Sequence, residues 1–217
     1  MGGTLDGDGL HWLDRFAAAY RTAGVTVSFE RLRAAFDAAE RRAAADEEIA
    51  TAGLRAMLER HVAWQLAYLE LTGEPLGSRI VDLFEQPIRD VAGRNAAVLR
   101  TLTARGLLVG VVSNGCGNVD VLCRDLGYAS ALSVVIDSRR AGVAKPDPRI
   151  YLTAAAALAL PATAIMMVGD SFDRDIVPAK AIGMRYIWRS TGSRSRRSTS
   201  TRGVIGPPAP PSKTKRR

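Results

Sequence analysis

The 217-residue chain, with 47% hydrophobic residues, is long enough to bury a core and favours one compact domain or a domain with an insertion. It lacks the run of ~20 apolar residues that a membrane span needs, and its N-terminus has neither the basic flank nor the apolar stretch of a signal peptide. These features exclude a membrane-spanning chain and predict a soluble, cytoplasmic protein. Its two cysteines, Cys116 and Cys123, fit no zinc or redox spacing and are expected to be free thiols.

The formal net charge of +8 is concentrated at the C-terminal end of the chain. Residues 190–217 contain eight basic residues and no acidic one, which leaves 22 basic and 22 acidic residues in 1–189. Because this segment is rich in Ser, Pro and Arg, we predict a disordered or non-native basic tail. Such a tail contacts nucleic acid only non-specifically, so the charge does not indicate a nucleic-acid-binding protein. No pattern indicates an oligomeric state.

Helical periodicity begins after Gly9 and continues to about residue 88. Breaks at 24–26, near residue 46 and at 72–77 divide this region into three or four helices. His11 and His61 lie in or beside the apolar stripes, so we expect core-edge histidines and not metal ligands. The stripes at helical spacing are Trp12, Phe16 and Tyr20, then Leu32, Phe36 and Ala39, and then Leu54, Leu58, Val62, Leu66 and Leu69.

From about residue 89 short apolar runs alternate with helical segments, which predicts right-handed crossovers and a parallel α/β sheet. The run at 107–112 suits a strand buried on both faces. Sites in such sheets lie at the carboxyl ends of the strands, where Ser113 and Asp170 both fall. The predicted strands are 107–112, 134–136, 165–168 and 184–188. Four helices are predicted with them: one that ends at 106, two that span 118–127 and 148–158, and one that begins near 173.

The residues after the first of these strands suit an anion. Ser113 offers a hydroxyl group, and the backbone N–H groups of Asn114 and Gly115 stand at the loop that opens the next helix. Lys145 is flanked by Pro146 and Pro148, whose restricted φ angles present its ammonium group with little conformational freedom. These residues predict a phosphate site, although each also suits an ordinary turn or surface position.

The stretch VGDSFDRD at 168–175 follows a second buried strand and contains the candidate metal ligands. Asp170 and Asp175 supply hard oxygen atoms, and Mg²⁺ takes one or two protein carboxylates beside water and phosphate oxygens. Asp170 and Ser171 also suit a helix cap. The three motifs together, in this order and on this topology, are more specific than any one alone.

In these motifs the chain resembles the haloacid dehalogenase-like hydrolase superfamily. VVSN at 111–114 is similar to the second motif of that family, Lys145 in GVAKPDP to the third, and GDSFDRD to the fourth. The resemblance implies a Rossmann-like core at 1–9 and 89–189 with an inserted helical cap at 10–88. It also implies a Mg²⁺ cofactor and phosphate-ester hydrolysis through an aspartyl-phosphate, with Ser113 and Lys145 as phosphate-binding catalytic residues.

The first motif of the family is only half present. Met1 to Leu5 looks like the segment that starts one residue after the nucleophilic Asp, so we expect the strand and the nucleophile to be missing. Gly2 falls where the acid/base Asp would be, and its carbonyl can still bind the metal. Because the chain also changes composition abruptly after Trp188, we expect a shifted reading frame or a misplaced start.

Four functional hypotheses follow from these residues. The leading one is a Mg²⁺-dependent phosphatase of a small phosphorylated metabolite, inactive for want of the nucleophile. Its alternatives are a metal-free haloacid dehalogenase and a catalytically silent phosphate-binding or regulatory protein. In the fourth, Asp6 attacks and Asp8 donates the proton; we disfavour it because no strand precedes Asp6, and predict a polar turn there instead.

Overall fold

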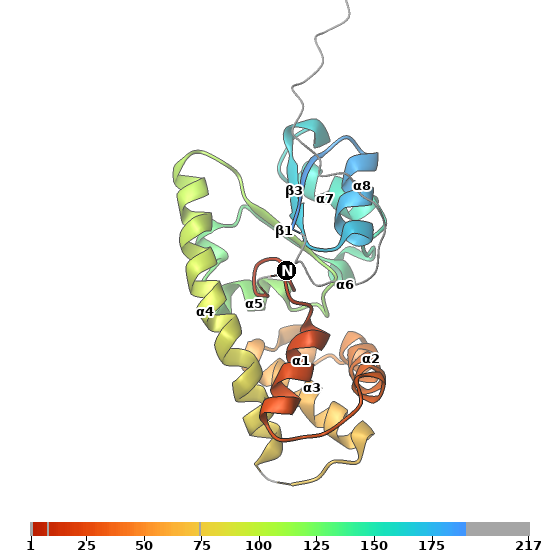
Figure 1. Cartoon of the computed structure of the whole chain (residues 1–217). Helices are drawn as coiled ribbons and strands as arrows, with labels where there is room; N and C mark the ends of the chain where they lie inside the picture. The colour runs from red at the N-terminus through yellow and green to blue at the C-terminus, as the bar shows by residue number, and fades with distance from the viewer. Residues whose placement is uncertain (1, 8, 74, 190–217) are drawn as a thin grey trace, which may run out of the picture.

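The computed structural model of the chain describes residues 2–7, 9–73 and 75–189. Asp8 and the predicted basic tail at 190–217 lie outside these residues. In Figure 1 the helices α1, α2 and α3 gather at one end of the molecule, and the strands with helices α5–α8 form the other. The N-terminal residues lie between the two ends.

The cap end consists of α1 (Trp12–Thr22), α2 (Phe29–Ala45), the short helix η1 (Ile49–Thr51) and α3 (Leu54–Leu69). The helices end where the sequence breaks were expected. His11 caps α1 by accepting a hydrogen bond from the Leu13 N–H, and Ser28 caps α2 through the Arg31 N–H.

Aromatic side chains form the centre of the cap. Phe16 stacks on Phe84 with ring centroids 4.1 Å apart and also packs against Phe36 at 6.0 Å. Each of these rings is almost fully buried, which stabilises the fold by roughly 2–3 kcal/mol per side chain. His61, expected at the edge of the core, lies inside it and is 2% exposed.

The helix α4 (Leu76–Ala104) joins the two ends of the molecule. At the usual rise per residue its 29 residues span about 44 Å. Figure 1 shows the helix running along one side of both ends. Ile80 and Phe84 pack in the cap, and Leu99 packs near the strands. The division expected between residues 88 and 89 therefore falls within a continuous helix that also contains Pro87.

The core end alternates strands and helices as predicted. Its strands are β1 (Gly110–Ser113), β2 (Val134–Asp137), β3 (Met166–Gly169) and β4 (Arg185–Trp188). Between them lie α5 (Val119–Asp125), η2 (Ala129–Ala131), α6 (Ser138–Ala141), α7 (Arg149–Ala157), η3 (Ala162–Ala164), a π-helical turn η4 (Phe172–Ile176) and α8 (Val177–Ala181). The α/β core with a helical cap is therefore confirmed.

The strands pair in parallel, but as two separate pairs. β1 pairs with β2, Ser113 opposite Asp137, and β3 pairs with β4, Gly169 opposite Trp188. The expectation of a doubly buried strand at 107–112 is wrong in its first half. Leu107 and Leu108 are more than half exposed, because the strand begins only at Gly110 and these two residues connect it to α4.

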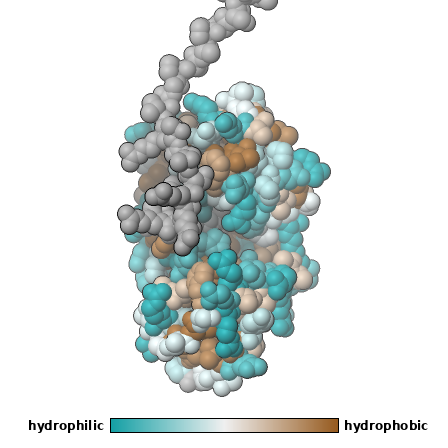
Figure 2. Space-filling model, turned by 45° about the vertical axis from the view of Figure 1, so that its right-hand side comes forward, coloured by the Kyte–Doolittle hydropathy of each residue, from teal (hydrophilic) through white to brown (hydrophobic). Residues whose placement is uncertain are grey.

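Apolar side chains of both strand pairs pack on a shared layer. Ile150 and Tyr151 of α7 are buried in one cluster with Val112 of β1, Ile136 of β2 and Met167 of β3. Figure 2 shows hydrophobic patches on one face of the molecule, at both the core end and the cap end. No helix in the described part of the chain is long and apolar enough to cross a membrane. The cytoplasmic location stays a prediction.

Candidate functional site

The residues that sequence reasoning selected for the site line one cavity of about 420 Å³ between the cap and the core. A cavity of this size suits a small ligand. The strand ends supply one wall, the cap helices another, and the N-terminal loop reaches into it. The predicted residues on its wall are Gly2, Ser113, Asn114, Gly115, Lys145, Asp170 and Asp175.

The loop after β1 is held in shape by Asp137 at the end of β2. Its Oδ2 accepts hydrogen bonds from the Gly117 N–H at 2.9 Å and the Val119 N–H at 3.1 Å. The Gly115 N–H donates to Ser138 Oγ at 3.1 Å. A Cβ at Gly115 would lie 2.7 Å from Asp137 Oδ2, so only glycine fits this approach. Ser113 is thereby presented at a rigid, buried strand end.

Lys145 is positioned from both its backbone and its side chain. The Lys145 N–H donates to Asn114 Oδ1 at 2.8 Å, and Asn114 Nδ2 donates back to the Lys145 carbonyl at 3.0 Å. The Lys145 Nζ lies 2.7 Å from Asp175 Oδ1, and both side chains are nearly buried. The side chain of Asn114 thus orients the lysine, and the lysine brings one positive charge to the cavity wall.

Asp175 is held on its other oxygen as well. Its Oδ2 accepts a hydrogen bond from the Ser171 N–H at 3.1 Å. Gly169 makes room for it, because a Cβ there would lie 2.5 Å from Asp175 Cβ. Both Asp175 oxygens therefore have protein donors, which suits a residue that supports Lys145.

Asp170 meets the N-terminal loop. Thr4 Oγ1 donates to Asp170 Oδ1 at 2.6 Å, and a Cβ at Gly3 would lie 2.4 Å from Asp170 Oδ2. Gly3 has φ +86°, a conformation that favours glycine. The loop is further tied to the core by Tyr128, whose hydroxyl donates to the Leu5 carbonyl at 2.8 Å.

Asp6 lies in a turn, as the sequence predicts, but its side chain is buried and lines the cavity. Its Oδ1 accepts from the Gly3 N–H at 2.8 Å, and Trp12 Nε1 approaches its Oδ2 at 3.4 Å. Burial raises the pKa of this carboxyl group. Asp8, the proton donor in the disfavoured hypothesis, lies outside the described residues.

Several cavity residues were missed by sequence reasoning. Asp37 and Glu40 reach the cavity from α2, and Arg174 reaches it from the turn after β3. Asp137 shapes the loop after β1 although it belongs to none of the selected motifs. Its position directly after a predicted strand was an available signal, whereas the helix periodicity of α2 marks only the buried face.

The cavity offers few oxygen donors for Mg²⁺. The described residues contain no group of three or more His, Cys, Asp or Glu side chains that could hold a metal ion. Asp170 and Gly2 line the cavity, and a carboxylate and a backbone carbonyl are both hard oxygen donors. Mg²⁺ fills most of its coordination sphere with water and phosphate oxygens. A weakly held, substrate-assisted ion is compatible with this donor set.

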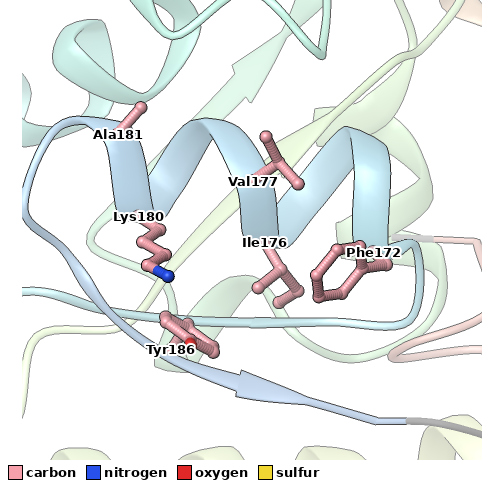
Figure 3. A pocket seen from close by; sticks show the side chains of 6 residues that line it. All are labelled: Phe172, Ile176, Val177, Lys180, Ala181 and Tyr186. Carbon is pink, nitrogen blue, oxygen red and sulfur yellow. The ribbon is translucent and has the colours of Figure 1, made fainter. Parts of the chain in front are cut away.

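A second pocket lies on the outer side of the core, between α8 and β4 (Figure 3). In Figure 3 Ile176 and Lys180 point from the helical segment toward the strand of Tyr186. The remaining lining residues, Phe172, Val177 and Ala181, are apolar. The pocket contains none of the predicted site residues and no carboxylate, so it lacks the chemistry of the cavity between cap and core.

The fold and the cavity define a capped α/β protein whose strand edge carries the Ser113 hydroxyl and the Lys145 ammonium group. The haloacid dehalogenase-like hydrolase family model matches residues 16–183. The chain belongs to this family of hydrolases. The match covers most of the cap, the loop after β1, Lys145 and the turn containing Asp170 and Asp175.

Relatives support the same family. The chain is 29% identical over 181 residues to the bovine (Bos taurus) haloacid dehalogenase-like hydrolase domain-containing protein 3, covering 78% of this chain and 71% of the relative. The zebrafish (Danio rerio) protein of that name is 33% identical over 44% of this chain and 40% of its own length. A phosphoserine phosphatase of Thermus thermophilus is 33% identical over 45% of this chain. The match covers 40% of the length of the zebrafish protein and 40% of the length of the Thermus phosphatase.

A solved dehalogenase structure shares the fold. It has a TM-score of 0.58 and 20% sequence identity, and the match covers 89% of this chain and 83% of the dehalogenase. At this identity the similarity shows the fold alone.

Proposed function

We propose that the cavity binds the phosphate group of a small phosphate ester, as in a phosphatase of this family. The observation that carries the proposal is the convergence of Ser113, Lys145 and Asp170 on one cavity from three separate motifs. Lys145 supplies a fixed cation, and the Ser113 hydroxyl stands on a loop braced by Asp137. Among the relatives, phosphatases of Thermus thermophilus and Pyrococcus abyssi support the same substrate class.

In this proposal Asp170 and the Gly2 carbonyl would hold Mg²⁺, and Asp175 keeps the Lys145 ammonium group in place. The ion, when bound, neutralises charge on the phosphate oxygens. The Thr4 hydroxyl orients the Asp170 carboxylate through its 2.6 Å hydrogen bond. Ser113 and Lys145 hold the phosphate against that side of the cavity.

Hydrolysis further requires an attacking group. Five carboxylates among the described residues line the cavity. Three of them already make hydrogen bonds within the protein: Asp170 with Thr4, Asp175 with Lys145 and Asp6 with Gly3. Asp37 and Glu40 belong to the cap helix. We propose that the chain binds phosphate but turns it over only when a carboxylate is supplied at the strand edge.

The binding test is calorimetric titration of inorganic phosphate with and without Mg²⁺. We expect binding by the chain and at least a tenfold loss in K145M and in S113A, because each removes a direct phosphate partner. K180M is the matched control, since Lys180 lies in the second pocket and its loss should leave binding unchanged. Equal binding by K145M and K180M would refute the site.

The turnover test compares three proteins on an aryl phosphate: the chain, the chain preceded by a hydrophobic strand ending in Asp, and the same extension ending in Asn. We expect Mg²⁺-dependent phosphate release only with the Asp extension. Activity in the unextended chain that is lost in D6N would instead make Asp6 the nucleophile. Binding without turnover in all three would identify a silent phosphate-binding protein.

A further inference from the structure

Glu40 stands on the cap side of the cavity, facing the wall that carries Ser113, Lys145 and Asp170. It lies near the C-terminal half of α2, and its side chain is 47% exposed. The carboxylate is therefore accessible to a ligand bound at the opposite wall. In a cavity of about 420 Å³ one small molecule can reach both walls.

A buried histidine holds Glu40 from behind. His61 Nε2 lies 3.0 Å from Glu40 Oε1, and the ring is only 2% exposed. On the other side of the ring, Gln65 Nε2 lies 2.7 Å from His61 Nδ1, and Gln65 is fully buried. Because a carboxylate can only accept, this contact assigns the imidazole proton to Nε2, which donates it to Glu40, and Nδ1 then accepts from the Gln65 amide.

Aromatic rings lock this histidine in place. Phe16 stacks on His61 with ring centroids 5.3 Å apart and an interplanar angle of 7°, and Phe36 packs at 5.4 Å. Burying two polar side chains among aromatic rings costs free energy unless their hydrogen bonds are made. Gln65, His61 and Glu40 therefore form a chain of hydrogen bonds, called here the relay, in which the Glu40 carboxylate is the accessible end. The two buried side chains hold this carboxylate in a preorganised orientation.

The two walls of the cavity differ in charge. On the cap wall the formally charged groups, Asp37 and Glu40, are both carboxylates, whereas the core wall carries the cations Lys145 and Arg174 beside Asp170 and Asp175. The charge of Glu40 also acts on Cys116, in the loop after β1. Burial is the largest cause that raises the pKa of Cys116 to about 11, and the negative charge of Glu40 is the next. A phosphate at the core wall thus leaves a site for a cation at the cap wall and repels a second anion.

We propose that Glu40, oriented by His61, binds an ammonium group on the leaving-group side of the ligand, so that the cavity selects aminoalkyl phosphates. This inference rests on the proposed phosphate site and adds the class of substrate. A carboxylate and a primary ammonium form a charge-assisted hydrogen bond, which is stronger than a neutral one. Phosphate esters with a carboxylate on the leaving group should bind poorly.

The test compares 2-aminoethyl phosphate with n-propyl phosphate, which differ by an ammonium in place of a methyl group. In calorimetric titrations we expect the amine to bind about tenfold more tightly to the chain. E40Q should bind both ligands equally. D37N is the matched control: Asp37 has the same charge on the same wall, but no hydrogen bond or ion pair with another described residue orients it, so D37N should keep most of the preference.

Inorganic phosphate separates failure of this inference from failure of the phosphate site. Phosphate binding that is equal in the chain and E40Q, with no preference between the two esters, would overturn the role of Glu40 and leave the site intact. If D37N and E40Q lost the preference for 2-aminoethyl phosphate equally, the role of Glu40 would also be overturned. The preference would then come from the total negative charge of the cap wall and not from the carboxylate held by His61. Failure of all phosphate ligands would refute the site itself.

Discussion

At the scale of single residues, the site depends on side chains that are held by partners distant in sequence. Lys145 is fixed by Asn114 and Asp175, which lie 31 and 30 positions away. Asp137 organises a loop 18 to 20 residues before it. Each of these groups has restricted freedom before a ligand arrives, so binding costs less ordering entropy than it would with mobile side chains.

Cys116 allows a direct test of the electrostatics at this scale. Burial, together with the charges of Glu40 and Asp137, raises the pKa of Cys116 to about 11. The thiolate is the reactive form, so at pH 8 its fraction is about a hundredfold lower than for a thiol with the ordinary pKa. We expect slow alkylation by iodoacetamide that accelerates about tenfold per pH unit from 8 to 10.

Peptide mass spectrometry after timed alkylation measures this rate at Cys116 separately from Cys123. E40Q should react faster than the unaltered chain at the same pH, because a neighbouring negative charge is removed. A rate at pH 8 equal to that of a small free thiol would contradict the buried environment of Cys116.

At the scale of elements, cap and core are joined by more than the chain connections. The first N–H of α3, at Leu54, donates to Asp125 Oδ2 of the core helix α5 at 2.8 Å. The N-cap residue of α3 is Gly53, which has no side chain to make this bond. Arg139 of α6 adds hydrogen bonds to the Asp46 and Cys116 carbonyls, at 2.9 and 3.0 Å. Together these contacts hold the two walls of the cavity at a fixed separation.

Removing the Asp125 carboxylate, which accepts the hydrogen bond from the first N–H of α3, should destabilise the protein. We expect D125A to lower the free energy of unfolding by about 1 kcal/mol, the usual loss when a helix N-cap acceptor is deleted. Urea denaturation followed by circular dichroism measures the change. D125N keeps an acceptor oxygen and should lose less; equal losses in D125A and D125N would show that the cap hydrogen bond is not the source.

At the scale of the whole molecule, charge is divided between a neutral body and a basic C-terminal segment. The body, residues 1–189, has 22 basic and 22 acidic residues, and the eight basic residues of 190–217 account for the net charge of +8. Polyanion binding by this protein should therefore be a property of the segment and be independent of the fold.

A chain ending at Arg189 tests this division. We expect it to lose heparin binding at low salt while its unfolding midpoint in urea stays unchanged, because the buried hydrophobic residues of the described chain all lie between Leu13 and Met184. A full-length variant with the eight basic residues replaced by Gln is the matched control and should behave in the same way. Heparin binding retained by the shortened chain would place the polyanion site on the body.

Local pattern by itself determined the helices of the cap, the approximate strands of the core and the strand-end positions of Ser113 and Asp170. These follow from periodicity and from residues next to one another, which act over a few positions. The same pattern overestimated the strand at 107–112, because apolar composition does not reveal whether a neighbour covers it.

Tertiary structure alone decided which cap residues complete the cavity and how its side chains pair. The pairing of strands into two sheets, the ion pair of Lys145 with Asp175 and the relay from Gln65 to Glu40 all join residues brought together by packing. Such contacts depend on the relative placement of whole elements, which no local spacing encodes. For this reason the phosphate motifs could be read along the chain, whereas the charged cap wall that faces them could not.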